Sequence, residues 1–363
     1  MMKIGVILGT RPEIIKMSPI IRELGGRNYF IIHTNQHYSE NMDSIFFQEL
    51  NLPSQDYNLN IGSGTHGEQT GKMLAKIEKI LLNEKPDLVV VQGDTNTVLA
   101  GALAASKLNI KIAHIEAGLR SYDRTMPEET NRVLTDHISD YLFAPTKTAK
   151  NNLLKEGINE KNIFVVGNTI VDATLQNLRI AEERESIKEF LTKITNGKDY
   201  FLLTLHRAEN TDNIERLKNI VESIIQVVEH FNHNIVFPIH PRTEKKLKEY
   251  DLMKKLENNP LIKIIEPIGY LEFLILEKNA KLILTDSGGV QEEACILKVP
   301  CVTLRENTER PETLEVGSNM LAGYNKEKIM NSVEIMLKRN RNWENPFGDG
   351  NAGKKIVEIL YNY

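Results

Sequence analysis

The chain has 363 residues, of which 41% are hydrophobic and 26% are charged, an ordinary composition for a soluble globular protein. That length is more than one core comfortably holds, so we expect two domains. The formal net charge of −4 excludes a global attraction to nucleic acid or to an anionic membrane, so any phosphate-binding site must be local.

Targeting signals are not evident in the sequence. The first residues lead directly into the apolar stretch at 4–8, without the basic region and cleavage site of a secretory signal. The longest uncharged run, near 95–106, is shorter than the roughly 18 apolar residues of a membrane helix. We therefore expect a cytoplasmic enzyme or binding protein.

Metal and disulfide chemistry is also not expected. Cys295 and Cys301 form neither a disulfide framework nor a CxxC pair, and we expect both side chains to lie in the core. The closely spaced histidine pairs have no third candidate ligand nearby, which argues against a metal site.

Short apolar segments alternate with longer amphipathic ones from end to end, the pattern of a doubly wound α/β protein. In the first half we expect strands near 3–8, 29–33, 87–92, 111–115, 141–143 and 162–166. Between them we expect helices near 12–24, 39–50, 65–83, 96–108, 127–138, 146–156 and 169–180.

The stretch at 180–199 is rich in charge and contains no expected strand, so we place the crossing between domains there. The second half then repeats the alternation, with strands near 200–205, 234–239, 262–266, 281–285 and 301–304. A loop and one last helix follow residue 340. The predicted domains are 1–180 and 181–345, with a C-terminal segment at 346–363.

The segment "LILTDSGGVQEEACILKVP" (282–300) runs from an apolar strand into a turn and a helix. Ser287, Gly288 and Gly289 stand where backbone N–H groups at a helix start attract anions such as phosphate. Glu293 lies one turn further, about 6 Å along the helix, where a carboxylate could bind a ribose diol. The alternative is a tight turn followed by solvated glutamates.

Cations stand near corresponding strand ends. Arg310 follows a strand in "RENTERPET", and Arg11 and Lys16 lie in "GTRPEIIK". A guanidinium can bind a diphosphate through two hydrogen bonds, although a surface ion pair is an equally good reading for Arg11 or Lys16 alone. The dinucleotide and Walker fingerprints are absent, which argues against the ordinary NAD and ATP sites.

Acid and base candidates occur after strands or at helix starts: Asp94 in "QGDTNT", Glu116 in "HIEAGLRS", Glu128 in "MPEETNR" and His206 in "TLHRAEN". Any one of them could be a helix cap or an ion-pair partner. If the two domains face each other, the four groups would converge and supply an acid and a base.

The motifs together resemble the non-hydrolysing UDP-N-acetylglucosamine 2-epimerases over essentially the whole chain. Besides those quoted, the resemblance rests on "GNTIVDA", "TERPE" and "NPFGDG". It implies a glycosyltransferase-B-like fold, with two Rossmann-like domains, a cleft between them and a last helix that crosses back to the first domain. It also implies a cytoplasmic homodimer that interconverts UDP-GlcNAc and UDP-ManNAc for surface polysaccharide synthesis.

The resemblance further implies a reaction without cofactor or metal, in which UDP is eliminated to give 2-acetamidoglucal and then added back. On this basis Asp94, Glu116, Glu128 and His206 are the expected catalytic residues. The expected UDP-binding residues are Arg11, Lys16, Phe273, Ser287, Gly288, Gly289, Glu293 and Arg310. Bacterial members often have Gln where this chain has Ile268, so one contact to uracil is in doubt.

Some bacterial relatives bind UDP-GlcNAc at a second, regulatory position. Gln36, Arg207 and His240 match parts of that pattern, whereas Ser39 and the stretch "IGSGTHGEQ" depart from it. The resemblance also implies domain closure around the sugar. Three alternatives stay open: a hydrolysing epimerase that releases ManNAc and UDP, a glycosyltransferase, and a non-catalytic nucleotide-sugar sensor.

Overall fold

A computed structural model describes residues 2–35 and 46–362 of the chain. The chain divides into two compact units. Unit 1 comprises residues 1–175 and 347–363, and unit 2 comprises residues 176–346. The boundary at residue 175 falls inside a continuous helix, α7 (Thr169–Glu183), so one helix contributes to both units.

Unit 1 is built on a seven-stranded sheet whose paired strands all run parallel, in the order β3-β2-β1-β4-β5-β6-β7. Near-continuous apolar runs form its central strands, as expected for a sheet covered on both faces. The strands are β1 (Ile4–Leu8), β2 (Tyr29–His33), β3 (Tyr57–Asn58), β4 (Leu88–Gln92), β5 (Lys111–Ile115), β6 (Tyr141–Ala144) and β7 (Ile163–Val165).

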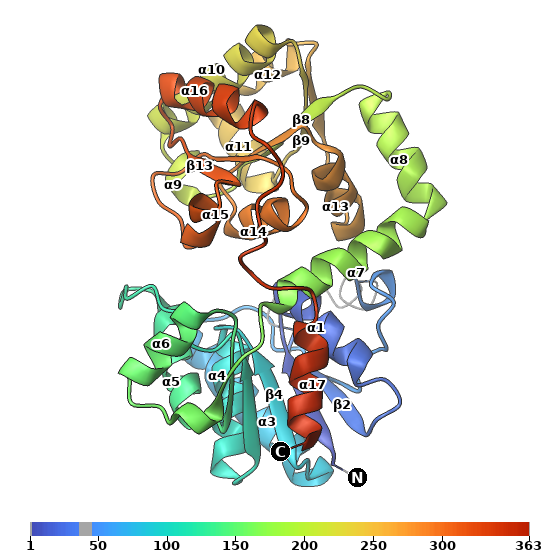
Figure 1. Cartoon of the computed structure of the whole chain (residues 1–363), viewed down its shortest axis with the longest axis vertical. Helices are drawn as coiled ribbons and strands as arrows, with labels where there is room; N and C mark the ends of the chain where they lie inside the picture. Colours follow the sequence, from blue (N-terminus) through green and yellow to red (C-terminus); the bar gives the residue numbers. More distant parts are fainter. Residues whose placement is uncertain (1, 36–45, 363) are drawn as a thin grey trace. The chain divides into compact units, whose positions relative to one another are not determined.

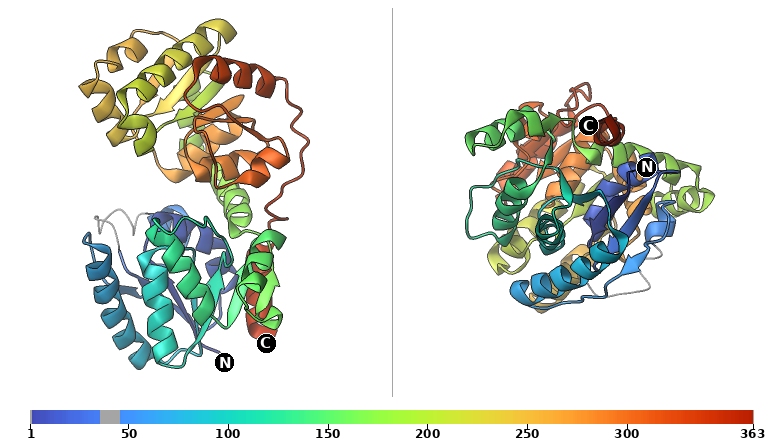
Figure 2. Two further views of the ribbon diagram at one scale, coloured as in Figure 1. Left: turned by 90° about the vertical axis from the view of Figure 1, so that its left-hand side faces the viewer. Right: turned by 90° about the horizontal axis from the view of Figure 1, so that it is seen from below.

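Helices cover both faces of this sheet. Buried side chains of α3 (His66–Glu84) and α4 (Asn96–Lys107) share one core with strand residues such as Ile7 and Val91. The unit also contains α1 (Arg11–Glu23), α5 (Pro127–Ile138), α6 (Lys147–Lys155), a short 3-10 turn (Glu160–Asn162) and α17 (Ala352–Asn362). Seen from below in Figure 2, α3 and α17 lie on opposite sides of the strands.

The C-terminal helix α17 belongs to unit 1, as the resemblance implied. It packs along α1, and its buried side chains include Ile356 and Leu360 (Figure 1). The carboxylate of Asp172 accepts hydrogen bonds from the N–H groups of Ala352 (3.2 Å) and Gly353 (2.9 Å). These bonds satisfy two donors at the start of α17 and tie it to α7.

Unit 2 repeats the architecture with a six-stranded parallel sheet in the order β10-β9-β8-β11-β12-β13. Its strands are β8 (Tyr200–Thr204), β9 (Asn234–Pro238), β10 (Ile262–Ile265), β11 (Leu282–Thr285), β12 (Cys301–Thr303) and β13 (Asn319–Leu321). The predicted α/β class with two Rossmann-like sheets is therefore confirmed.

The helices of unit 2 also form two layers. Side chains of α10 (Ile214–Phe231), α12 (Met253–Glu257) and α16 (Lys326–Leu337) share a core with alternate residues of the strands. The unit also contains α8 (Glu185–Thr195), α9 (Ala208–Thr211), α11 (Pro241–Glu249), α13 (Tyr270–Asn279), α14 (Gly288–Ile296) and α15 (Pro311–Glu315). Among these, α14 contacts both β11 and β12.

In each sheet the strand order reverses once, between β1 and β4 in unit 1 and between β8 and β11 in unit 2. Ligands of open α/β sheets bind beyond the carboxyl ends of the strands at such a reversal. The turns there begin at Gly9 and Gly93 in unit 1 and at Leu205 and Asp286 in unit 2. The fold therefore places the predicted motifs at two topological switch points.

The predicted strands all exist, with ends that differ by one residue at most. Sequence patterns missed β3 and β13, of two and three residues, and the helix α8 within the charge-rich stretch. The helix expected near 39–50 falls mostly outside the described residues. No helix in the ranges 2–35 and 46–362 combines the length and apolar character of a membrane span.

Candidate functional site

The switch point of unit 1 presents two predicted cations. Arg11 opens α1 directly after the β1 turn and is exposed, with its guanidinium carbon 5.8 Å from the centre of the Phe46 ring. Lys16 lies on the same helix and is half-buried. The turn itself is tight, because a Cβ atom on Gly9 would lie 2.2 Å from hydroxyl oxygens of Thr34 and Thr97.

Glu116 is the most constrained of the predicted acids. Its φ of 68° lies in the left-handed region, where a side chain is strained, and the residue is 8% exposed. Its two carboxylate oxygens lie 2.6 and 2.8 Å from Nζ of Lys16. Gln92 (2.5 Å) and Asn168 (3.3 Å) also donate to it. Such surroundings hold the carboxylate in one position.

Asp94 is half-buried and binds Arg132, which lies in α5. The Nη2 and Nε atoms of Arg132 lie 2.6 and 3.0 Å from the same oxygen, Oδ2 of Asp94. Asn131 donates to the main-chain oxygen of Asp94 at 2.9 Å. Because Arg132 uses one carboxylate oxygen only, Oδ1 of Asp94 has no bond to that guanidinium.

Glu128 and Glu129 begin α5 side by side but differ in their environment. Glu129 is buried and accepts from the N–H groups of Ser121 (3.0 Å) and Tyr122 (2.9 Å) and from Arg132 (2.7 Å). Glu128 is half-buried, and its carboxylate has no hydrogen-bond or ion-pair partner within the described part of the chain. Glu129 therefore fixes the loop, whereas the carboxylate of Glu128 makes no such contact among the described residues.

A supporting pair in unit 1 was missed from the sequence. His114 and Asp136 are both buried, with Nδ1 of His114 2.7 Å from Oδ1 of Asp136. Nε2 of His114 lies 2.8 Å from the carbonyl oxygen of Gly93, next to Asp94. Burial alone would raise the pKa of Asp136, but His114 and Arg120 together lower it. The signal was "HIEAG", whose histidine lies on β5, two residues before Glu116, which directly follows that strand.

In unit 2, His206 follows β8 and meets Asp286, which follows β11. Nδ1 of His206 lies 3.1 Å from Oδ1 of Asp286, which is fully buried. Asp286 also accepts from the main-chain N–H groups of His206 and Arg207 (2.9 Å) and from Asn210 (3.2 Å). Burial raises the pKa of Asp286, but His206 and these donors outweigh it, so the carboxylate is ionised.

The predicted anion site lies at the start of α14. Cβ atoms added to Gly288 or Gly289 would come no closer than 3.6 Å to the neighbouring atoms, so packing alone does not demand glycine here. The nearest atoms to such a Cβ on Gly288 belong to Glu309 and Arg207. Arg207, expected at a regulatory position, therefore places its guanidinium beside the helix start.

Glu293 lies further along α14 and is 7% exposed. The hydroxyl of Tyr270 donates to its Oε1 at 3.0 Å (α13). A second carboxyl group, Glu277, is fully buried, and neither of its oxygens has a hydrogen-bond partner among the described residues. Burial and then the nearby Glu293 raise the pKa of Glu277 well above its usual range, so Glu277 is neutral.

Arg310 and Phe273 complete the predicted set in unit 2. Nε of Arg310 lies 2.7 Å from Oε1 of Glu292, which is 2% exposed, so a buried carboxylate holds the guanidinium. Phe273 is half-buried on α13. Sequence reasoning missed the role of Glu292, because its neighbour Glu293 has the better spacing from Gly289.

The expected regulatory residues are only partly described. The ring of His240 lies 5.8 Å from that of His206, and its Nδ1 accepts from the N–H of Arg242 (3.2 Å). Burial, followed by the charges of His206 and Arg242, lowers the pKa of His240. Gln36 lies outside the described residues.

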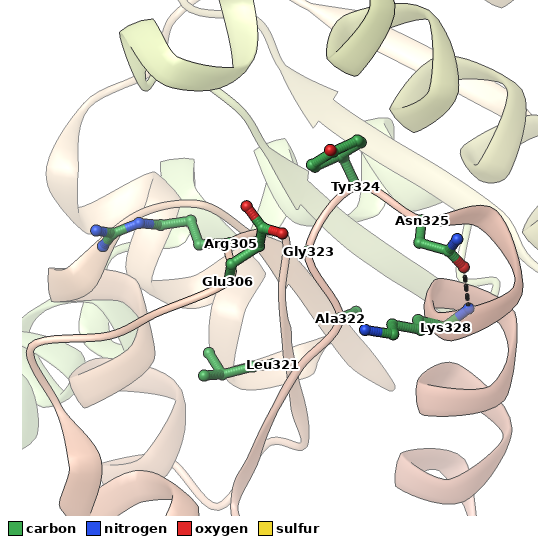
Figure 3. A pocket seen from close by; sticks show the side chains of 8 residues that line it. All are labelled: Arg305, Glu306, Leu321, Ala322, Gly323, Tyr324, Asn325 and Lys328. Carbon is green, nitrogen blue, oxygen red and sulfur yellow. Dashed lines mark hydrogen bonds between the residues drawn. The ribbon is translucent and has the colours of Figure 1, made fainter.

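A cavity of about 490 Å³ lies elsewhere in unit 2, at the ends of β12 and β13 (Figure 3). The guanidinium of Arg305 points away from the other labelled side chains, whereas the Lys328 side chain points toward Ala322. None of the predicted site residues lines this cavity.

Both cysteines are buried, as predicted. Over residues 2–35 and 46–362, no group of three or more His, Cys, Asp or Glu side chains could hold a metal ion.

Two kinds of chemistry follow from these side chains. Unit 1 presents carboxylates at strand ends, one paired with Lys16 and one with Arg132, which suits proton transfer. Unit 2 presents a helix start with two glycines that are not tightly packed and a neighbouring guanidinium, which suits an anionic ligand.

Comparison with known proteins points to one family. The family model described as UDP-N-acetylglucosamine 2-epimerase matches residues 22–361. Proteins of that name from Methanococcus maripaludis and Methanocaldococcus jannaschii are 73% and 72% identical over 361 residues, which is 99% of this chain and 99% of each relative. A crystal structure of the M. jannaschii UDP-GlcNAc 2-epimerase in complex with UDP-GlcNAc and UDP is 71% identical, with a TM-score of 0.89 and full coverage of both chains.

Proposed function

Because the chain belongs to the UDP-N-acetylglucosamine 2-epimerase family, a family of isomerases, we propose that it interconverts UDP-GlcNAc and UDP-ManNAc without hydrolysis. The observation that carries the proposal is Glu116, a buried carboxylate held in a strained backbone conformation by Lys16 and Gln92. Strain of this kind is kept where a reactive group must be positioned. The complex of the M. jannaschii relative with UDP-GlcNAc and UDP supports the choice of substrate.

The chemistry requires an acid or base group on each face of the sugar at C2. The proton on C2 is adjacent to no carbonyl, so simple deprotonation is hard. In the proposed reaction a base removes this proton while the bond from C1 to the diphosphate oxygen breaks, and the electron pair leaves with UDP. The product is 2-acetamidoglucal. Return of UDP to C1, with protonation of C2 from the opposite face, gives the epimer.

The proposed base and acid are drawn from Asp94, Glu116 and Glu128. Glu128 has an unpaired carboxylate among the described residues, and Asp94 keeps one oxygen clear of Arg132. His206, oriented by buried Asp286, would carry positive charge when protonated and would stabilise the departing diphosphate. No redox cofactor enters this scheme, because UDP itself is the group that leaves and returns.

UDP must be retained while it is detached. In the proposal its phosphates bind at Ser287, Gly288 and Gly289 with help from Arg310, and its ribose binds Glu293. Phe273 would lie against the uracil ring. Arg11 and Lys16 are the proposed UDP-binding cations of unit 1.

The broader setting follows from the resemblance alone. We propose a homodimer in the cytoplasm that supplies UDP-ManNAc for surface polysaccharide synthesis. Activation by UDP-GlcNAc at a second position, involving Gln36, Arg207 and His240, belongs to the same group of proposals.

The test is incubation of the purified protein with UDP-GlcNAc in heavy water, followed by NMR of the recovered sugars. The proposal expects UDP-ManNAc with deuterium at C2 and no free ManNAc. Free ManNAc with UDP would identify the hydrolysing reaction instead. Binding of UDP without any deuterium at C2 would favour a sensor. A transferase would also leave C2 unchanged, and it would transfer the sugar once an acceptor is added.

A further inference from the structure

One buried carboxylate in unit 1 lies outside the set assigned above and joins the two turns that carry Arg11 and Asp94. Glu13, on the first turn of α1, is 3% exposed. Its Oε2 accepts from the N–H groups of Gly9 (2.6 Å) and Thr10 (2.9 Å), at the end of β1. Its Oε1 lies 2.5 Å from the hydroxyl oxygen of Thr95, directly after Asp94.

From these contacts we infer that Glu13 is a positioning residue, which locks the turn before Arg11 to the turn that carries Asp94. The turns belong to β1 and β4, the strands on either side of the switch point. They are more than 80 residues apart in sequence, and the hydrogen bonds of Glu13 reach both of them. The inference rests on the proposed function, in which Arg11 and Asp94 act on one substrate.

Glu13 can gain or lose a proton without losing its hydrogen bonds to the two turns. Two main-chain donors point at Oε2, so a proton on Glu13 must sit on Oε1, where it can be donated to the Thr95 hydroxyl oxygen. When Glu13 is ionised, the Thr95 hydroxyl donates instead. The hydroxyl serves in both directions because it is both donor and acceptor.

The charge state of Glu13 changes near neutral pH. Burial raises the pKa of Glu13 to about 7, against the effect of its three donors, and the neighbouring Asp94 adds to the rise. Asp94 is the charged group of the opposite turn that acts on Glu13. On its own helix, Arg11 is exposed and Lys16 binds Glu116. Between about pH 6 and pH 8, negative charge therefore builds up next to Asp94.

The experiment compares Glu13→Ala, Glu13→Gln and the control Glu23→Gln, which alters an exposed glutamate of the same helix. Glu13→Ala should lower kcat for UDP-GlcNAc epimerisation about 100-fold, the scale of a 1 Å misplacement of reacting groups. Glu13→Gln should stay within about threefold of the wild type at pH 7, because an amide can make the same contacts. In the wild type, ionisation of Glu13 should produce a step in the dependence of kcat on pH near pH 7. Glu13→Gln should lack this step, whereas Glu23→Gln should keep it.

A second pair of variants tests the other end of the lock. Thr95→Ser keeps the hydroxyl and should behave as wild type, while Thr95→Val should reproduce the loss seen in Glu13→Ala. If Glu13→Ala is folded and fully active, or if Glu13→Gln keeps the step near pH 7, the inference is wrong.

Amide hydrogen exchange separates this inference from the proposed function. In the protein without nucleotide, the Gly9 and Thr10 amides should exchange at least tenfold faster in Glu13→Ala than in the wild type and Glu23→Gln. Unchanged exchange would overturn the lock whatever the enzyme does. Fast exchange together with a wild type that does not epimerise UDP-GlcNAc would overturn the proposed function and leave the lock standing.

Discussion

Nδ1 of His206 lies 3.1 Å from Oδ1 of Asp286, a fully buried carboxylate at the end of the neighbouring strand β11. The two residues are 80 positions apart, and the parallel pairing of β8 with β11 brings their strand ends together. Asp286 thereby fixes which way the His206 ring faces. This contact gives a histidine at a strand end one defined orientation.

We expect Asp286→Asn to lower turnover about 100-fold, because an amide no longer holds the His206 ring in the same orientation. His206→Gln should lower kcat by a similar factor. The double variant should be no worse than either single variant, since both remove one acting unit. Steady-state kinetics with UDP-GlcNAc provides the measurement. Additive losses in the double variant would show that Asp286 acts independently of His206.

Glu116→Gln and Glu128→Gln should each reduce kcat by orders of magnitude and leave UDP binding within a few fold. Neither carboxylate is placed to contact UDP itself in the proposal, and an amide cannot exchange a proton at the sugar. Isothermal titration with UDP and deuterium incorporation at C2 measure the two effects separately. Glu23→Gln, which alters an exposed glutamate of α1, serves as the control. Normal turnover in Glu128→Gln would remove that residue from the mechanism.

Arg310→Ala should chiefly weaken UDP binding, by loss of a guanidinium that can contact the diphosphate. It also leaves Glu292 buried without its ion-pair partner, which we expect to lower the free energy of unfolding by roughly 1–3 kcal/mol. Adding Glu292→Gln to Arg310→Ala should restore stability but not UDP affinity. Thermal unfolding and UDP titration of the three variants provide the measurement. Recovery of affinity in the double variant would mean that Arg310 acts only through Glu292.

Glu277→Gln should stabilise the protein at neutral and alkaline pH. In the folded protein burial and Glu293 raise the pKa of Glu277 well above its ordinary 4.5, so Glu277 stays protonated when the unfolded chain ionises. Below pH 4.5 both states are protonated and Glu277 adds no pH dependence. As pH rises above that value, the free energy of unfolding falls by up to about 1.4 kcal/mol per unit.

The variant lacks this loss, so its advantage over the wild type should be near zero at pH 4 and should grow toward pH 8. Chemical denaturation across that range measures it, with exposed Glu257→Gln as the matched control. A constant difference between variant and wild type at every pH would show that Glu277 does not titrate in this range.

The local pattern of the sequence was enough to predict most of the strands and the motifs that follow them. Apolar runs of the right length identified the long strands, because a strand buried on both faces must be apolar throughout. Glycine and acid motifs directly after those runs identified Asp94, Glu116, His206 and the start of α14, because parallel strands send their carboxyl ends to one edge. The short strands β3 and β13 carry too few residues to show a period, so they were missed.

Which side chains form ion pairs and hydrogen bonds with each other was decided by tertiary structure alone. No feature of the sequence near Glu116 predicts its pairing with Lys16, a hundred residues away. The strained backbone of Glu116 also has no sequence signature. The pairs of Asp94 with Arg132, His206 with Asp286 and Arg310 with Glu292 likewise join different elements. The sequence alone determined which residue types stand at the strand ends, since that depends on local pattern. Which of them form an ion pair or a hydrogen bond depends on strand order and burial, and only the folded chain defines these.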